Sequence, residues 1–354
     1  MTMETPLVSI AIPTVNRLDY LKEAVASALA QTYEHIEVLI GDDGPTKEIE
    51  EWTRGISELD SRVRYQRNKR RLGLAGNWNA LANTARGEFL IIIGDDDRLL
   101  PEFVETLSEI IPSSGQVAFS NHYLIDSKGM RLETESTQMT SRYHRDNLSA
   151  GEIKNPAVCV WQNSVPMSAA MVRTEVVKRL RFKEDLNTPE IEFFALLAEE
   201  GGRFFFTPEY LAEYRVHDKS ATVAGLRGET LVKYLAPIAV AADVEPYKRE
   251  FMTSLLVNTV TRCLQQGNRK LARQFLSHEY YPGLHLKRMK RPEKTKRTSP
   301  QRFTAHASNR ALHQVLKETL TSSVQVLCTW LPSSVGYPTY RLLQTTKSRL
   351  FGHP

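Results

Sequence analysis

Two short apolar runs near the N-terminus, separated by a helical pattern, constrain the fold of this chain most. Residues 7–13 (LVSIAIP) stop at a proline and residues 36–41 (IEVLIG) stop at a glycine, which is typical of buried strands. Between these runs, apolar residues recur at helical spacing, at Leu18, Leu21, Val25, Ala28 and Leu29. A strand, a helix and a second strand in this order predict a βαβ unit with two parallel strands.

The alternation continues along the next eighty residues. Helical patterns alternate with apolar, strand-like runs in the order 45–58, 62–66, 76–85, 89–94, 101–111 and 117–126. Strands that alternate with helices over short connections favour a sheet whose two faces are both covered. We therefore predict an α/β fold with a mostly parallel sheet flanked by helices.

The second half of the chain is less regular. Residues 127–157 are polar and predict a loop over a site, while 189–200 and 203–206 resemble a helix and a strand. After about residue 229 the apolar periodicity is mainly helical. We expect two domains, a sheet domain at 1–228 and a helical C-terminal region at 229–354.

The charge of the chain is concentrated in one segment. The 354 residues carry a formal net charge of +5, but residues 287–302 contain eight Lys or Arg against the single acid Glu293. This segment therefore accounts for +7 and leaves the rest of the chain at −2, which argues against global nucleic-acid binding. Two interpretations of the segment stay open, a solvated linker and a peripheral contact with an anionic membrane.

The cysteines and the N-terminus indicate the compartment. Three cysteines lie far apart without the spacing of a zinc site, so we expect neither disulfides nor structural zinc. The first residues lack a basic stretch followed by an apolar one and run directly into the first strand. We expect a cytoplasmic protein with no signal peptide.

Acidic residues follow two of the predicted strands. Asp95, Asp96 and Asp97 follow the run at 89–93 after one glycine (GDDD, 94–97). Asp42 and Asp43 come directly after the run at 36–41. Ligands of open α/β sheets bind at the carboxyl ends of strands, and clustered carboxylates suit Mg²⁺ or Mn²⁺. Each cluster alone also fits a solvated turn, in which an aspartate caps the next helix.

At this point the sequence resembles the family 2 glycosyltransferases. The resemblance covers about the first 225 residues, with matching stretches at 8–44, 71–105, 196–202 (LLAEEGG) and 214–222 (YRVHDKSAT). The stretch at 8–44, with its strand, helix, QTY and DDG in this order, is the most specific. The resemblance implies a GT-A type, Rossmann-like fold and an inverting enzyme that uses a nucleotide-diphospho-sugar.

The resemblance also implies residues that bind the donor. Thr14 and Arg17 match positions that line the nucleotide, and Asp42 matches the carboxylate that bonds the base. Arg71 lies in a segment that contacts the nucleotide further on. In the D-x-D element of the family, Asp95 and Asp96 are expected on the donor side, with Asp96 near the ribose.

The metal ligands implied by the resemblance are Asp97 and His217. Asp97 is expected on Mn²⁺ or Mg²⁺, and His217 matches a histidine that approaches the metal or the diphosphate. Gly94 stands where the family usually has the first aspartate of the element, so the carboxylate that binds the metal directly is left open.

The catalytic base is expected at the start of the helix at 189–200. The family places an acidic pair there, and counting back from Gly201 this chain has Pro189 and Glu190. Glu190 is our candidate base, with Glu192 and Asp185 as competitors, since glutamate reaches one methylene further than aspartate. A first-turn acid that only stabilises the helix is the alternative.

These residues predict a metal-dependent inverting glycosyltransferase. It would move a sugar from a nucleotide-diphospho-sugar to a hydroxyl of a glycan or a lipid-linked saccharide. A nucleotidyltransferase that makes an activated sugar is one alternative, although residues 12–20 (IPTVNRLDY) have no glycine for a phosphate loop. A catalytically degenerate nucleotide-binding scaffold is the other, because Pro189 and Glu190 replace the usual pair.

Overall fold

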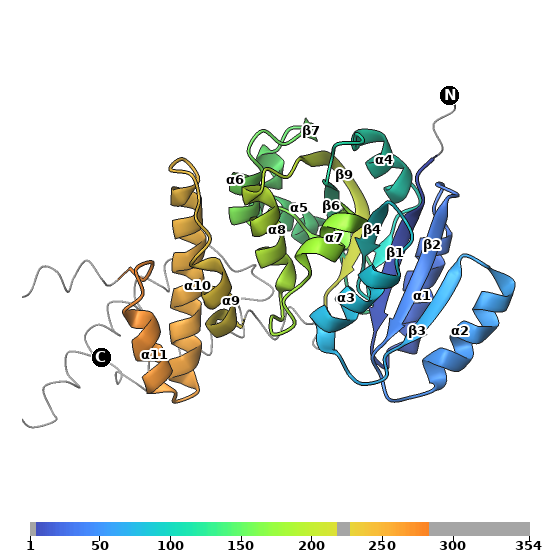
Figure 1. The fold of residues 1–354 in the computed structure, drawn as a ribbon, viewed down its shortest axis with the longest axis horizontal. Coiled ribbons are helices and arrows are strands. Elements are labelled where there is room, and N and C mark those ends of the chain that lie inside the picture. The colour runs from blue at the N-terminus through green and yellow to red at the C-terminus, as the bar shows by residue number, and fades with distance from the viewer. Residues whose placement is uncertain (1–4, 218–226, 283–354) are drawn as a thin grey trace, which may run out of the picture. The chain divides into compact units, whose positions relative to one another are not determined.

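A computed structural model describes residues 5–217 and 227–282 of the chain (Figure 1). The described residues as far as Tyr281 belong to one compact unit. Nine of its strands form one sheet, and their bounds are β1 Val8–Thr14, β2 Ile36–Asp42, β3 Val63–Arg67, β4 Phe89–Ile92, β5 Arg98–Leu99, β6 Val117–Ile125, β7 Gly151–Glu152, β8 Ala170–Arg173 and β9 Phe204–Arg215. The sheet has the order β3-β2-β1-β4-β8-β6-β9-β5, and β7 pairs with β9.

Most strands of the sheet point the same way. β1 pairs in parallel with β2 and β4, and β2 pairs in parallel with β3. β8 is antiparallel to both β4 and β6, and β9 is parallel to β6, so β6 and β9 share the direction of the first four strands. Only β5, β7 and β8 run against it. The expected α/β fold with a mostly parallel sheet is confirmed.

Helices cover both faces of the sheet. Their bounds are α1 Leu18–Leu29, α2 Glu48–Leu59, α3 Gly73–Thr84, α4 Phe103–Ile110, α5 Glu133–Arg142, α6 Pro156–Trp161, α7 Thr174–Leu180, α8 Pro189–Glu199, α9 Gly228–Leu235, α10 Glu245–Gln265 and α11 Arg269–Leu276. Successive strand residues point to opposite faces. Val8, Ile10 and Ile12 therefore pack with α1, α2 and α4, whereas Ala11 and Leu39 face α3 and α8.

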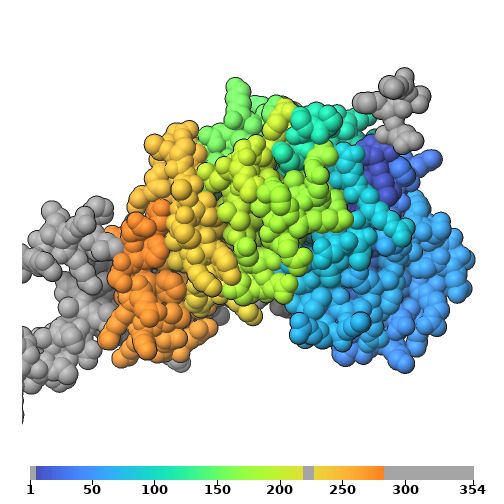
Figure 2. All heavy atoms as spheres, viewed as in Figure 1, coloured from blue at the N-terminus to red at the C-terminus, as the bar shows by residue number. Residues whose placement is uncertain are grey.

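The helices after residue 228 join the second of these cores. Leu231 of α9 and Met252 and Leu256 of α10 are buried in the same apolar cluster as Phe193 of α8 and Trp161 of α6. Figure 2 shows the yellow and orange atoms of α9, α10 and α11 continuing from the green atoms of α6 and α8. The expected helices after residue 228 are present, while the domain boundary at that residue stays a prediction. Residues 287–302 lie outside the described residues.

The stretch at 127–157 differs from the expected loop. It contains α5, whose sequence ETESTQMTSR has no apolar stripe. The helix buries two hydroxyl residues instead, Ser136 and Thr140. The Ser136 hydroxyl accepts a hydrogen bond from the Leu124 backbone amide of β6 at 2.8 Å. A helix that packs through hydroxyl groups lacks the apolar period by which helices are recognised in a sequence.

Candidate active site

The carboxyl ends of the strands that run the same way meet at one edge of the sheet, which we call the carboxyl edge. β1 and β2 end in register, with Thr14 beside Asp42. β4 ends at Ile92, two residues before the turn at 94–97. β9 ends at Arg215, opposite Ile125 of β6. The acidic clusters, the segment at 14–17 and His217 therefore all lie at this edge, as the sequence predicts.

Thr14 and Arg17 contact the acidic turn directly. The Thr14 hydroxyl donates to Asp95 Oδ2 at 2.8 Å, and the Val15 backbone amide approaches the same oxygen at 3.4 Å. Arg17 Nη1 lies 3.2 Å from Asp95 Oδ1 and 2.5 Å from Asp96 Oδ2. Burial raises the pKa of Asp95 to about 6, although the charge of Arg17 opposes the shift. Arg17 thus neutralises part of the acidic turn.

His217 and Arg215 approach the turn from the end of β9. His217 Nε2 lies 2.9 Å from Asp96 Oδ2. Asp97 Oδ1 accepts a hydrogen bond from the backbone amide of Arg215 at 3.0 Å. Burial, helped by the neighbouring charge of Asp96, raises the pKa of Asp97 to about 7.

Gly94 leaves room for two carboxylate oxygens to converge. A Cβ atom at this position would lie 2.6 Å from Asp96 Oδ1 and 3.0 Å from Asp97 Oδ2. Oxygens gathered on one side of a turn suit a hard divalent cation, and Mg²⁺ is usually bound by one or two carboxylates together with substrate phosphates. Among residues 5–217 and 227–282, no three His, Cys, Asp or Glu side chains are placed to hold a metal by themselves. The turn fits a cation whose other ligands come from the substrate.

The second acidic pair is bound to the protein itself. Asp42 is fully buried, and its carboxylate accepts hydrogen bonds from the Tyr65 hydroxyl at 2.7 Å and the Gly44 amide at 2.8 Å. Asp43 accepts from the backbone amides of Leu72 and Gly73 at 2.7 and 2.8 Å. Asp43 therefore anchors the segment that connects β3 to α3. Arg71, in this segment, is exposed at the carboxyl edge.

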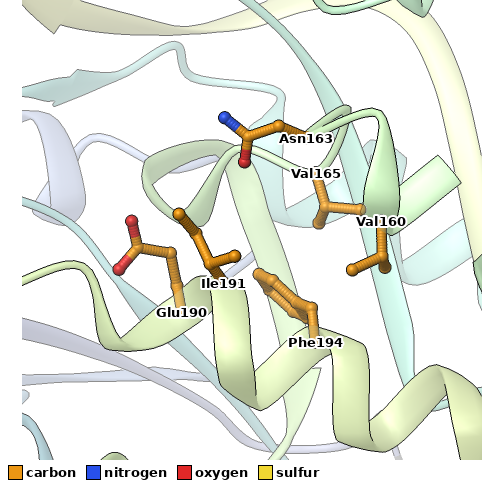
Figure 3. Close-up of a pocket in the computed structure, with 6 residues that line it drawn as sticks. All are labelled: Val160, Asn163, Val165, Glu190, Ile191 and Phe194. Carbon is orange, nitrogen blue, oxygen red and sulfur yellow. The ribbon is translucent and has the colours of Figure 1, made fainter. Parts of the chain in front are cut away.

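Glu190 lies at the start of α8 and borders a small recess (Figure 3). The other lining residues are mostly apolar: Val160, Asn163, Val165, Ile191 and Phe194. Asn163 has a left-handed backbone, with φ of 56°. Burial raises the pKa of Glu190 to about 7, although its own backbone amide opposes the shift.

The two competing carboxylates have different surroundings. Glu192 is buried and lies 3.8 Å from Lys183 Nζ. Asp185 is exposed and accepts a hydrogen bond from the Tyr234 hydroxyl of α9 at 2.9 Å. Of the three candidates, Glu190 is the one that lines the recess, so the geometry favours it as the group that meets an acceptor.

The direction of α8 brings Glu190 toward the acidic turn. α8 ends at Glu199, and the chain returns to β9, whose first residue Phe204 pairs with Val117 at the start of β6. The C-terminal end of α8 therefore lies at the opposite edge of the sheet. Phe194 packs on Phe204 with ring centroids 6.1 Å apart, and Glu190 lies four residues, or about 6 Å along the helix, before Phe194. Val165, which lines the same recess as Glu190, lies three residues before Ser168, whose side chain hydrogen-bonds to the Asp97 carboxylate.

Arg215 is a residue of this site that the sequence analysis did not single out. Its guanidinium donates from Nε to the carbonyl oxygen of Asp96 at 2.7 Å. The available signal was a charged residue two positions before His217, at the end of a largely apolar strand.

The site combines a Rossmann-like sheet, an acidic turn at its carboxyl edge and Glu190 at the start of α8, and comparisons with known proteins identify the class of enzyme. Residues 9–171 match the family model described as Glycosyl transferase family 2. The chain carries a family 2 glycosyltransferase domain of GT-A type and is a glycosyltransferase.

The relatives extend beyond this domain. An uncharacterised glycosyltransferase, MJ1057 of Methanocaldococcus jannaschii, is 26% identical over 66% of this chain and 78% of its own. The GalNAc(5)-diNAcBac-PP-undecaprenol beta-1,3-glucosyltransferase of Campylobacter jejuni is 22% identical over 68% of this chain and 74% of its own. The mannosyltransferase PcManGT of Pyrobaculum calidifontis, solved with GDP-Man and Mn²⁺, shares the fold. Its TM-score is 0.53 at 15% identity, and the match covers 78% of this chain and 80% of that one.

Helices long and apolar enough to span a membrane do not occur among the described residues.

Proposed function

We propose that this glycosyltransferase is a metal-dependent inverting enzyme that moves a sugar from a nucleotide-diphospho-sugar to a hydroxyl of a glycan or a lipid-linked saccharide. The observation that carries the proposal is the arrangement at the carboxyl edge. There an acidic turn held by Thr14 and Arg17 lies on the same edge as the start of α8, which carries Glu190, a carboxyl group of raised pKa. The acidic turn would bind the donor, and the Glu190 carboxylate would act on the acceptor hydroxyl.

The donor would be bound by the residues around the acidic turn. Thr14, Arg17, Asp95 and Asp96 already contact one another, and Asp42 and Arg71 lie on the neighbouring strand end and the segment after β3. The complex of PcManGT with GDP-Man and Mn²⁺ supports a nucleotide-sugar donor, since the two proteins share a fold.

A divalent cation, Mn²⁺ or Mg²⁺, would be held by Asp97 together with Asp96. His217 contacts Asp96 Oδ2, the oxygen that Arg17 also contacts, and from there it would reach the cation or the diphosphate. When bound, the cation stabilises the negative charge that develops on the leaving nucleoside diphosphate. Arg17 would bind the phosphates from the exposed side of the turn, since its guanidinium is already oriented by two carboxylates.

Glu190 would take the proton of the acceptor hydroxyl. A general base works best when its pKa is near the working pH, and burial holds the pKa of Glu190 at about 7. The apolar walls of the recess would pack against the acceptor while Asn163 offers an amide. The Campylobacter relative is named for an undecaprenol-linked substrate, which supports an acceptor of the lipid-linked class.

We also propose a cytoplasmic enzyme that contacts the inner face of an anionic membrane through residues 287–302. The catalytic domain would span residues 1–228 and the helical region 229–354 would carry this basic segment. Eight Lys or Arg in sixteen residues would attract anionic lipid. The remaining chain, at a net charge of −2, gives no reason to expect nucleic acid as a partner.

The direct test is a thermal-shift screen of nucleoside diphosphates and nucleotide sugars with and without Mn²⁺. A ligand that binds only the folded protein raises its melting temperature. We expect a nucleoside diphosphate to raise the melting temperature more when Mn²⁺ is present. Hydrolysis of the selected nucleotide sugar with Mn²⁺ then distinguishes an enzyme from a scaffold, which would bind without turnover, and from a nucleotidyltransferase, which would require a nucleoside triphosphate.

The first variant for this screen is Asp97→Ala. Because Asp97 would supply a direct oxygen to the cation, we expect the Mn²⁺-dependent part of the thermal shift to disappear. The Asp243→Ala variant, which changes an exposed aspartate just before α10, is the control. Unchanged Mn²⁺ dependence in Asp97→Ala would refute the assignment of the metal site.

A further inference from the structure

Arg215 connects the acidic turn at 94–97 to the helix α1. Its side chain is 1% exposed, and its Nη2 donates to Glu23 Oε2 of α1 at 2.6 Å. From the same guanidinium, Nε donates to the carbonyl oxygen of Asp96 at 2.7 Å. We propose that Arg215 is a positioning residue, with Glu23 as its partner, that holds the backbone of the turn and the Asp97 carboxylate in place for the cation. The inference rests on the proposed metal-dependent function.

The main chain of Arg215 acts on the same turn. Its backbone amide donates to Asp97 Oδ1 at 3.0 Å. This bond leaves Asp97 Oδ2 as the oxygen that turns toward Gly94, where Asp96 Oδ1 also lies. Arg215 thus contacts the Asp96 carbonyl oxygen and one oxygen of the Asp97 carboxylate, which Ser168 also contacts. The Asp96 carboxylate itself is held by Arg17 and His217, so Arg215 acts on the backbone of the turn and on Asp97.

Two residues of α1 hold the Arg215 side chain in place. The guanidinium stacks over the Tyr20 ring, 4.7 Å from its centroid, one turn before Glu23. The same Tyr20 ring lies 5.6 Å from the ring of His217, which contacts Asp96. Arg215, the last residue of β9, and His217, two residues after it, are therefore both packed against α1. Glu23 also forms an ion pair with Arg98 at 3.4 Å, so its carboxylate is paired with two arginine side chains.

Arg215 needs Glu23 as a partner because its guanidinium carries a buried positive charge. Removal of the carboxylate partner of a buried guanidinium is strongly destabilising, because it leaves an uncompensated buried charge. If the Arg215 side chain shifts in response, the Asp96 carbonyl oxygen that it bonds shifts with it. Residues that orient metal ligands from behind typically contribute tenfold to a hundredfold in metal affinity. We therefore expect Glu23, which would not touch the cation, to affect its binding.

The test measures the affinity for Mn²⁺ itself. Free Mn²⁺ is followed by electron paramagnetic resonance during titration of the full chain, once alone and once with saturating UDP or GDP. For Glu23→Gln and Arg215→Met we expect the Mn²⁺ dissociation constant to rise about tenfold or more. Arg215→Lys should lie between these variants and the wild type, because lysine keeps the charge for Glu23 but cannot also bond the Asp96 carbonyl.

Arg173 provides a matched control. It is also a mostly buried arginine, 13% exposed, that bonds two carbonyl oxygens and one glutamate. It stacks over Phe89 at 4.8 Å, much as Arg215 stacks over Tyr20. It pairs with the first residue of β4 and so lies at the edge opposite the acidic turn. Arg173→Met should lower stability without changing the affinity for Mn²⁺.

A second measurement distinguishes positioning from general damage. If Arg215 and Glu23 act on the cation, turnover of Glu23→Gln at low Mn²⁺ should fall and return toward the wild-type kcat as Mn²⁺ is raised. A merely structural defect would not be relieved by Mn²⁺. Glu23 is 43% exposed on a surface helix, so this variant should fold even if Arg215→Met does not.

Two results would overturn the inference in different ways. Equal Mn²⁺ affinity in Glu23→Gln and the wild type, with the wild type binding Mn²⁺, would show that the link to α1 does not position the turn. That result leaves the proposed function intact. Absence of Mn²⁺ binding by the wild-type chain, with and without nucleoside diphosphate, would instead refute the metal-dependent function and this role together.

Discussion

The protonation state of Glu190 affects both the stability of the fold and the catalysis that we propose. Apolar side chains such as Ile191 and Phe194 line the same recess, and burial raises the pKa of Glu190 to about 7. The compensating group is its own backbone amide, a free donor in the first turn of α8. Glu192, two residues after Glu190, lies 3.8 Å from Lys183 Nζ instead. The two acids of the first turn of α8 thus have separate environments.

We expect Glu190→Gln to abolish sugar transfer while it preserves nucleotide binding. Glutamine keeps the shape of the side chain but cannot accept the acceptor's proton, and loss of a general base typically lowers the rate 10²-fold to 10⁴-fold. Turnover and the Mn²⁺-dependent thermal shift with nucleoside diphosphate are measured on the same preparation. Glu192→Gln is the matched control, and loss of transfer in Glu192→Gln alone would move the base to that residue.

The raised pKa of Glu190 also predicts an effect on stability. A carboxyl whose pKa is about 7 in the folded state, against 4.5 ordinarily, binds more protons when folded than when unfolded between these values. Its contribution to stability is therefore lost as pH rises from 4.5 to 7. Glu190→Gln removes this ionisation and should stabilise the protein at pH 8 by up to about 3 kcal/mol.

Thermal unfolding at pH 4.5 and pH 8 checks this effect. The melting temperature of Glu190→Gln should exceed that of the wild type at pH 8, and the difference should shrink at pH 4.5, where the wild-type carboxyl is protonated. Glu184→Gln, an exposed change in the loop before α8, should show no such difference. The same titration predicts that wild-type kcat rises with pH through about 7. A kcat that falls over this range would exclude Glu190 as the base.

At the scale of elements, the strands and their common edge could be predicted from sequence, whereas several boundaries could not. The apolar runs at 7–13 and 36–41 became β1 and β2, since a short and nearly continuous apolar run between turn residues is typical of a strand covered on both faces. α3 begins at Gly73, three residues before the predicted start. The reason is Asp43, from another strand, which accepts the amides of Leu72 and Gly73. A cap supplied by a distant residue leaves no local signal.

β9 shows a similar limit. The sequence predicts a strand only at 203–206, because Pro208 lacks a backbone donor and normally ends pairing in a sheet. The strand instead continues to Arg215, with register shifts on β6 around Asn121. The Asn121 side chain donates to the Pro208 carbonyl oxygen at 2.8 Å and replaces part of the interrupted ladder. This continuation carries Arg215 to the acidic turn.

The site was predictable where its residues follow strands and unpredictable where it depends on contacts between distant elements. Thr14, Arg17, Asp95 and Asp96 are brought together because parallel strands end at one edge, a rule that can be applied to a sequence. The pairing of Arg215 with Glu23 joins residues 192 positions apart and follows from no motif. The assigned roles of all these residues stay predictions until variants are measured.

At the scale of the whole molecule, charge separates the enzyme into a nearly neutral body and one basic segment. Residues 287–302 hold +7, and the rest of the chain sums to −2. If the segment binds anionic lipid, each cation near the surface contributes about 1 kcal/mol, so eight together would outweigh the weak repulsion from the body. If it is a linker, its charges serve only to keep it extended and solvated.

The two interpretations predict different behaviour of a variant without residues 287–302. The full chain should sediment with vesicles that contain phosphatidylserine and lose this association as salt rises from 50 to about 500 mM, since screening shortens the range of the attraction. The deletion should sediment no more than it does with neutral vesicles. A chain of equal length in which the eight basic residues are replaced by Gln is the control for spacing. Equal sedimentation of all three chains would leave the segment as a linker, and loss in the deletion but not in the Gln variant would show that spacing rather than charge matters.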